Sequence, residues 1–226
     1  MLNNFDLEKA IKIQKKLQEK IIMKCENSNF KNVAGVDLAY WQKNNKEYAV
    51  CCIVVINSIT KEVVEKQHFI DSINFPYIPG FLAFRELPLI LKTVEKLKII
   101  PDLYMFDGNG YLHPHHMGIA TYSSFFLKKA TIGIAKNYYK INNIDYIIPD
   151  NENNAYTDIV INNEVYGRTL RTHKNVKPIF ISVGNYIDID TTTKIVCNFV
   201  NKESRIPLPT RLADIETKII RKEEIH

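Results

Sequence analysis

The chain has 226 residues, of which 46% are hydrophobic and 24% charged, and its formal net charge is +5. This mildly basic balance permits a polyanionic partner but does not require one. The four cysteines show neither CxxC spacing nor the density of a disulfide framework, so we expect reduced thiols and a cytoplasmic location. Because no window reaches the roughly 18 apolar residues of a membrane span and no signal-peptide core follows the N-terminus, a soluble protein without a membrane partner is expected.

The N-terminal segment, residues 1–30, is predicted to contain an amphipathic helix. Apolar side chains recur at helical spacing within 6–24, lysines fill the opposite face, and Asp6 suits the N-cap position. Although the chain exceeds the soft prior of about 150 residues per domain, no linker divides the sequence. We therefore expect one domain, 1–226, on which this helix packs.

Three predicted strands follow the helix. Runs rich in β-branched residues predict strands over 32–40, 48–56 and 61–70. The connections KNNKE and NSIT are short enough for hairpins, so the three strands are expected to pair antiparallel.

A helical segment is predicted after the Pro-rich loop NFPYIPG, from Phe81 to about Ile99. Pro88 removes an amide donor inside this segment. Either the helix kinks at the proline or Glu86 lies close to the helix start, and the sequence leaves both alternatives open.

The second half of the chain alternates predicted strands with helices. Strands 103–106 and 130–135 are separated by a helix from about 116 to 127, and a helix-length crossover favours parallel pairing. Further along, the patterns predict strands over 165–172 and 177–184 and helices over 189–199 and 210–221. The predicted class is α/β with a ribonuclease H-like mixed sheet, in which three antiparallel strands precede alternating parallel strands and helices, with helices on both faces.

Three carboxylates stand in apolar surroundings: Asp37 in VAGVDLAY, Glu86 in FLAFRELP and Asp107 in YMFDGNG. Mg²⁺ prefers hard oxygen ligands, and carboxylates that converge from different strands suit phosphodiester hydrolysis. Taken singly, each residue has an ordinary structural explanation as a salt-bridge partner, a helix cap or an Asx-turn acceptor. In a ribonuclease H-like sheet, however, Asp37 and Asp107 lie on neighbouring strands and Glu86 reaches them from an adjacent helix.

Six segments carry a specific resemblance: GVDLAY, PYIPGFLAFRELP, DGNGYLHPHHMGIA, TIGIAK, KPIFISVG and IPLPTRLAD. In this order, over about residues 33–214, they closely resemble the endonuclease V, or deoxyinosine 3′-endonuclease, family. The resemblance implies a monomeric enzyme that uses Mg²⁺, for which Mn²⁺ can substitute, and that recognises inosine, the deaminated form of adenosine, in DNA. It implies cleavage of the second phosphodiester bond 3′ to the lesion, in DNA repair. Two alternatives stay open: a ribonuclease of the same family that acts on inosine in RNA, and a catalytically inactive binding module for deaminated nucleic acid.

The resemblance also implies roles for individual residues. Asp37, Glu86, Asp107 and Lys136 would be catalytic, the lysine by placing a positive charge near the scissile phosphate. Asp37 and Asp107 would hold the metal, and Asp214 would complete a second metal site unless it only pairs with Arg211.

Substrate contacts are implied in the same way. Tyr77 in PYIP matches the wedge that enters the duplex where the damaged base leaves the stack, and the flanking prolines, Pro79 among them, stiffen that loop. The pocket for the flipped base would be lined by main-chain groups, and His113 would contact phosphate or lie near the metal. The full set of implied substrate-binding residues is Tyr77, Pro79, Gly80, Leu82, Gly108, His113 and Ala135.

Four positions depart from the family pattern. Asn185 and Tyr122 stand where many relatives carry histidine, and His115 and His116 where relatives often carry arginine. None of these positions is one of the carboxylates, so activity is still expected, while the range of substrates could differ.

Overall fold

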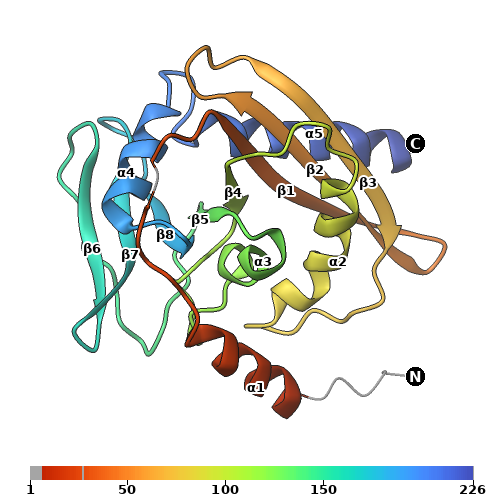
Figure 1. Cartoon of the computed structure of the whole chain (residues 1–226), viewed down its shortest axis with the longest axis horizontal. Helices are drawn as coiled ribbons and strands as arrows, with labels where there is room; N and C mark the ends of the chain where they lie inside the picture. Colours follow the sequence, from red (N-terminus) through yellow and green to blue (C-terminus); the bar gives the residue numbers. More distant parts are fainter. Residues whose placement is uncertain (1–6, 27, 226) are drawn as a thin grey trace.

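The seven runs predicted as strands and one further strand form an eight-stranded mixed sheet in the computed structural model, which describes residues 7–26 and 28–225 (Figure 1). The strand order across the sheet is β3-β2-β1-β4-β5-β8-β7-β6. The predicted α/β class with a mixed sheet is confirmed. The strands are β1 (Asn32–Lys43), β2 (Lys46–Asn57), β3 (Val63–Ser72), β4 (Leu103–Asp107), β5 (Ala130–Ala135), β6 (Ala155–Ile161), β7 (Glu164–Arg171) and β8 (Ile179–Asn185).

The first three strands pair antiparallel, as predicted from their short connections. The turn between β1 and β2 consists of Asn44 and Asn45, whose φ angles are 52° and 60°. Two consecutive left-handed residues match the right-handed twist of the flanking strands, and asparagine tolerates this conformation better than most residues. The asparagine pair therefore fixes the register of this hairpin.

The middle of the sheet is parallel, because β4 pairs parallel with both β1 and β5. The last three strands pair antiparallel with their neighbours, and β8 also runs antiparallel to β5. The sequence patterns did not predict β6. Its turn to β7 at Asn162 and Asn163, with φ of 52° and 64°, repeats the asparagine-pair signal of the first hairpin.

Helices cover both faces of the sheet (Figure 1). Alternation along β1 directs Ala34 and Val36 into the core beneath α2 and α3, and Val33 into the core beneath α4 and α5. The N-terminal helix packs outside the α2–α3 layer through Ile13 and Leu17. None of the described helices is long and apolar enough to cross a membrane. The helices are α1 (Leu7–Gln18), α2 (Leu82–Val94), α3 (Ile119–Leu127), α4 (Ile189–Asn198) and α5 (Leu208–Ile225).

Two predicted details concern the ends and interior of helices. Asp6, the expected N-cap of the first helix, lies outside the described residues. Helix α2 begins at Leu82 and continues past Pro88, which places Glu86 one turn after the helix start. None of the four cysteines takes part in a disulfide bond within the described residues.

A close approach between β1 and α5 sets the geometry of the site. A Cβ atom added to Gly35 would lie 2.0 Å from the carbonyl oxygen of Pro209, so any larger residue would push the helix away from the sheet. Because Gly35 precedes Asp37 by two residues, both lie on the face of β1 that α5 covers. The glycine thus brings the side chains of α5 within reach of Asp37.

Candidate metal-dependent active site

Three carboxylates converge at the end of the parallel part of the sheet. Asp37 on β1 and Asp107, the last residue of β4, lie side by side because Val36 pairs with Phe106 in the parallel register. Asp214 reaches them from α5. One oxygen from each carboxylate lies within 4.8 Å of the others. The structure therefore brings together all three residues that were predicted to bind metal.

Lys136 joins this group from the first position after β5. Its Nζ lies 2.5 Å from Oδ2 of Asp107 and 3.0 Å from Oδ1 of Asp214. Lys218, one turn further along α5, lies 2.6 Å from the other oxygen of Asp214. Three carboxylates thus share two ammonium groups, which leaves a surplus of negative charge.

The electrostatics of Asp37 reflect that surplus. Burial, followed by repulsion from Asp107, raises the pKa of Asp37 to about 7, although the hydroxyl of Thr217 donates a hydrogen bond of 2.8 Å to its Oδ2. Desolvation and a neighbouring like charge both disfavour the ionised carboxylate. A bound cation would relieve both effects.

Glu86 approaches from the opposite face of the sheet, on α2. Its carboxylate is buried and accepts a hydrogen bond of 2.5 Å from the hydroxyl of Tyr40. Burial raises the pKa of Glu86 to about 7, with further contributions from the charges of Asp37 and Asp107. Glu86 is therefore within electrostatic reach of the three-carboxylate group but is not part of it.

The sequence analysis did not single out Tyr40. It lies on the α2 side of β1, the face opposite to Asp37, and strand alternation from Val36 through Leu38 could have identified it. Arg85 was also missed: its guanidinium is buried, forms an ion pair of 2.6 Å with Glu47 and packs over the ring of Tyr40.

The predicted wedge lies in the loop before α2. Tyr77 is 68% exposed and Pro79 is also exposed, whereas Gly80 adopts a φ of 81° that favours glycine. The buried side chain of Gln14 on α1 donates a hydrogen bond of 3.0 Å to the carbonyl of Gly80. At the start of the loop, Arg85 donates 2.6 Å to the carbonyl of Phe75. The loop is thus fastened at both ends while its tip projects into solvent.

His113 is placed as a support for this loop. Its ring is buried beside Gly80, and its Nδ1 accepts the backbone amides of His115 at 3.1 Å and Met117 at 3.3 Å. Burial lowers the pKa of His113 to about 4. Because Nδ1 serves as an acceptor, the ring is held in its neutral form.

The other residues predicted to line the base pocket lie at two places. Gly108 follows Asp107 directly, and a Cβ added to it would lie 2.7 Å from Ile119, so only glycine fits there. Ala135 ends the adjoining strand β5 and is buried, whereas Leu82 is half-buried at the first turn of α2. The pairing of β4 with β5 brings Gly108 and Ala135 close to the carboxylates.

Comparison with known proteins identifies the family. A family model described as Endonuclease V matches residues 15–215. A protein named Endonuclease V from Bacillus thuringiensis subsp. konkukian is 60% identical over 230 residues, which cover 98% of this chain and 97% of the relative. The chain belongs to the Endonuclease V family.

Solved structures of Endonuclease V agree with this assignment. The crystal structure from Bacillus subtilis is 50% identical with a TM-score of 0.94, and the match covers 100% of this chain and 98% of that one. Endonuclease V from Ciona intestinalis, 26% identical with a TM-score of 0.84 over 96% of this chain and 98% of that one, was crystallised with a 24mer DNA containing an inosine followed by a ribo-adenosine. As a member of this family, the chain is a deoxyinosine 3′-endonuclease, a phosphodiester hydrolase of DNA repair with a ribonuclease H-like fold.

Two departures from the Endonuclease V pattern have structural roles. The buried Asn185 accepts the backbone amide of Ile22 at 2.8 Å and donates 3.0 Å to the hydroxyl of Ser124, so it fastens the segment after α1 to β8. Tyr122 is buried against Phe84, with ring centroids 4.8 Å apart. Because Asn185 pairs with the β5 end opposite to Lys136, it lies far from the carboxylates.

The two other departures, His115 and His116, follow His113 closely in the chain. Nδ1 of His115 lies 2.6 Å from the side-chain oxygen of Gln14, which continues the chain of hydrogen bonds that reaches Gly80. The ring of His116 is stacked on Tyr111, with centroids 3.9 Å apart. Both histidines thus contact other side chains of the Endonuclease V fold.

Proposed function

We propose that this enzyme binds a DNA strand at inosine and cleaves the second phosphodiester bond on the 3′ side, using Mg²⁺ or, in its place, Mn²⁺. The observation that supports the proposal is the convergence of Asp37, Asp107 and Asp214 beside Lys136 in a chain of the Endonuclease V family. The family membership gives the reaction class, and the three-carboxylate group gives it a place in the fold.

The three carboxylates fit a divalent ion. They offer hard oxygen ligands within 4.8 Å of one another, and their combined negative charge exceeds the positive charge of the two nearby lysines. When bound there, the ion would supply Lewis-acid stabilisation of phosphate charge and would lower the pKa of a water. Asp37, Asp107 and Asp214 would hold it, and Thr217 would keep Asp37 oriented.

Lys136 and Glu86 act on either side of this group. With its ammonium group between Asp107 and Asp214, Lys136 is positioned to stabilise negative charge that develops on the scissile phosphate. Glu86, which is buried and oriented by Tyr40, is the carboxylate available to accept a proton from the attacking water.

Recognition of inosine is assigned to the loop before α2 and the loop after β4. Tyr77, exposed at its tip and flanked by Pro79, would fill the gap that the flipped base leaves in the stack. Hypoxanthine lacks the 2-amino group of guanine and has a 6-oxo group where adenine has an amine, so a tight pocket of main-chain donors separates the three bases. The residues proposed to line it are Gly80, Leu82, Gly108 and Ala135, with His113 behind them.

The decisive assay compares matched end-labelled DNA and RNA strands, each with one inosine, with and without Mg²⁺. A third strand carries a ribonucleotide directly after the inosine, as in the DNA bound to the Ciona protein. We expect a nick one nucleotide beyond inosine only in the presence of the metal. Cleavage of RNA alone would favour the ribonuclease alternative, and binding of inosine strands without any cut would favour the binding module.

Two properties remain predictions. We expect the enzyme to act as a monomer and to reside in the cytoplasm. Light scattering of the purified protein, alone and with an inosine strand, would contradict the first prediction if the mass corresponds to two copies of the chain.

A further inference from the structure

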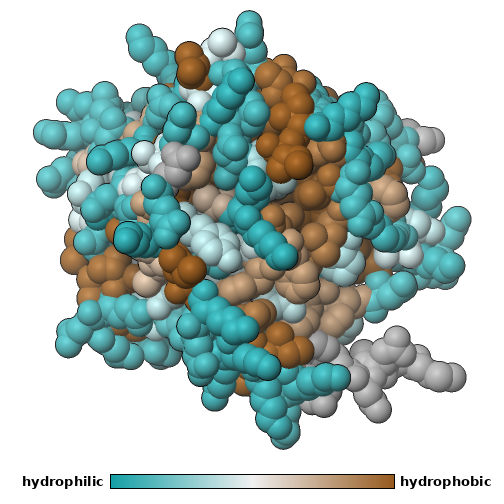
Figure 2. Space-filling view, viewed as in Figure 1, coloured by the Kyte–Doolittle hydropathy of each residue, from teal (hydrophilic) through white to brown (hydrophobic). Residues whose placement is uncertain are grey.

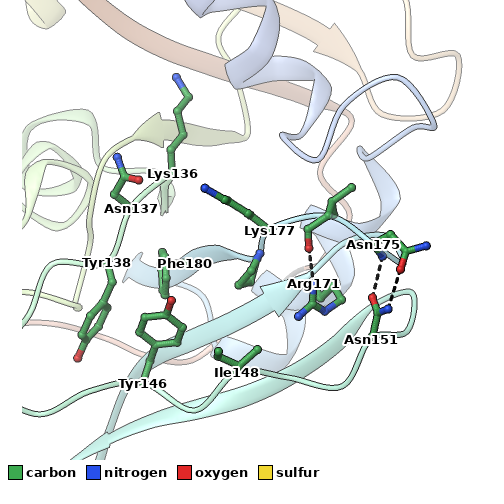
Figure 3. A pocket seen from close by; sticks show the side chains of 12 residues that line it. Lys136, Asn137, Tyr138, Tyr146, Ile148, Asn151, Arg171, Asn175, Lys177 and Phe180 are labelled. Atoms are coloured by element: carbon green, nitrogen blue, oxygen red, sulfur yellow. Dashed lines mark hydrogen bonds between the residues drawn. The ribbon is translucent and has the colours of Figure 1, made fainter.

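A groove of about 660 Å³ has Lys136 among the residues that line it (Figure 3). Its walls come from the segment after β5, the loop before β6, the end of β7 and the start of β8. Its volume lies within the range of about 300–1,000 Å³ that is typical of ligand pockets. None of the residues implied by the family resemblance, apart from Lys136, lines it.

Besides Lys136, two cations line the groove, Arg171 and Lys177, and neither forms an ion pair with an acidic side chain among the described residues. Lys177 is exposed, and within the described residues its side chain forms neither an ion pair nor a hydrogen bond. The guanidinium of Arg171 donates to the carbonyls of Asp150 at 2.9 Å, Pro149 at 3.3 Å and Val176, all main-chain oxygens. Carbonyl acceptors orient an arginine but leave its net charge in place.

Arg205, which is not among the residues that line the groove, supports two residues that are. Arg205 donates 2.7 Å to the carbonyl of Pro178 and 3.5 Å to the carbonyl of Lys136. At the rim, the side chain of Asn151 bonds both the side chain and the amide of Asn175 at 2.7 Å (Figure 3). These bonds fix the groove before any ligand enters, which lowers the entropic cost of binding.

Aromatic and apolar surface lies between these charges. Phe180 packs against Tyr138 and Tyr146, with ring centroids 5.3 and 4.8 Å apart. Tyr146 is only half-buried, its hydroxyl has no hydrogen-bond partner among the described residues, and Ile148 beside it is 66% exposed. A flat ring next to unpaired cations is the combination that binds an unpaired base together with its phosphate.

Another hollow of the structure differs from the groove in the chemistry of its lining. That hollow, of about 430 Å³, lies between α2 and α3 and is lined mostly by apolar side chains such as Leu91 and Phe126. Figure 2 shows the apolar surface that gathers over α3 and the segment between α2 and β4. The charged residues that line this hollow are Glu95 and Lys129, one of each sign, whereas those that line the groove are the cations Lys136, Arg171 and Lys177.

We propose that this groove binds the part of the substrate strand that adjoins the scissile phosphate, with Lys177 and Arg171 near its phosphates and Tyr146 stacked on a base. The inference rests on the proposed function, because it takes the phosphate to lie at Lys136. Lys136 is part of both the three-carboxylate site and the groove. Its ammonium group lies among the carboxylates, and the residue lines the groove. A strand cut at the carboxylates therefore continues into the groove.

The test uses fluorescence anisotropy with three inosine-containing single strands in a chelating buffer, so that they stay intact. One strand is long on both sides of inosine, one is truncated just beyond the cut, and one is truncated just before the inosine. We compare the wild type with Lys177→Ala and Tyr146→Leu. The control is Lys194→Ala, an exposed lysine of α4 that does not line the groove and has no ion-pair partner among the described residues.

For the long strand, Lys177→Ala should weaken binding about threefold to tenfold and reduce the slope of log affinity against log salt by about 0.7–1. Tyr146→Leu should weaken binding about fivefold or more, and Tyr146→Phe, which keeps the ring, should restore most of that loss. The loss of affinity in both variants should vanish for one of the two truncated strands. The flank that this strand lacks is the one that the groove binds.

The proposal is overturned if Lys177→Ala and Tyr146→Leu bind all three strands as Lys194→Ala does. It is also overturned if their losses are the same for the long strand and for both truncated strands, since the groove would then not hold a flank. Cleavage of the long strand in Mg²⁺ is measured in parallel. If the wild type shows flank-dependent binding but does not cut the strand, the result contradicts the proposed function and still supports binding of the strand in the groove.

Discussion

The three-carboxylate group and the loop before α2 are built in opposite ways. Asp37 and Asp107 stand on paired strands of the central sheet, and Asp214 is held against them because Gly35 admits α5. The loop, residues 73–81, belongs to no strand, and only its first and last residues, Ile73 and Phe81, are part of the core or packed against it; side chains from elsewhere hold it in place. The sheet fixes the chemical groups, whereas a few hydrogen bonds position the recognition groups.

This difference implies that cleavage and lesion selection can be altered separately. Changes among the carboxylates should abolish the cut without loosening the loop. Changes in the supports of the loop should weaken selection for inosine while the metal group remains complete. A variant that alters both properties in proportion would contradict the comparison.

The largest effect is expected for Asp107→Ala. Loss of a central ligand removes several kcal/mol of stabilisation, so cleavage should fall about 10³-fold or more. Binding of the inosine strand should change little, because the loop is untouched. Single-turnover cleavage and anisotropy measure the two quantities. Glu223→Ala, an exposed carboxylate near the end of α5, is the control and should behave as the wild type.

His113 should make the support of the loop sensitive to acid. Its pKa is lowered by burial to about 4 in the folded state, against about 6.5 in an unfolded chain. The unfolded state therefore binds the proton first, and stability that is fully present above about pH 6.5 declines as the pH falls towards 4, by at most about 3 kcal/mol.

Urea unfolding of the wild type and His113→Gln between pH 7.5 and 4.5 tests this expectation. The variant should be less stable at pH 7.5, where the neutral histidine contributes most, and the difference between the two proteins should shrink as the pH falls. A constant difference over the whole range would show that His113 does not titrate between the two states.

A smaller effect is expected for Tyr40→Phe. The variant keeps the ring under Arg85 but removes the hydrogen bond to the buried Glu86. Hydrogen bonds to charged groups contribute about 1.5–3 kcal/mol, so kcat should fall about tenfold or more with little change in binding. The matched control is Tyr48→Phe on β2, whose hydroxyl has no hydrogen-bond partner among the described residues. An unchanged kcat would separate Glu86 from catalysis.

The sequence predicted the metal group better than its surroundings, for a physical reason. Asp37 and Asp107 interrupt apolar runs, and strand pairing then places them together, so their own neighbours in the sequence reveal them. Neither Tyr40 nor Gln14 breaks the pattern around it. Tyr40 looks like any aromatic residue of a strand, and Gln14 looks like any polar residue of a helix. Their roles depend on contacts between residues 46 and 66 positions apart, which local patterns do not contain.

The same argument covers the missed strand β6. Its exposed positions alternate with partly or fully buried ones, but the apolar Tyr156 and Val160 face solvent and its partner β7 covers only one edge. The asparagine pair at Asn162 and Asn163, which repeats that of the first hairpin, was the usable signal. Fewer side chains are buried in an edge strand of this kind, so its pattern of hydrophobic residues is weaker.

The smallest and most selective effect is expected for Gln14→Ala. The buried amide joins the carbonyl of Gly80 to His115, so its loss leaves both groups without this partner and lets the loop shift. One hydrogen bond contributes about 0.5–1.5 kcal/mol, which corresponds to about a twofold to tenfold loss of preference for inosine over adenine. Cleavage of a saturating inosine strand should be nearly unchanged, because the carboxylates do not depend on α1. Gln18→Ala, on the same helix and without a side-chain hydrogen bond in the described part of the chain, is the control. If Gln14→Ala instead lowers kcat and preserves selection, the supports of the loop and of the metal group are coupled, and the separation between the two regions does not hold.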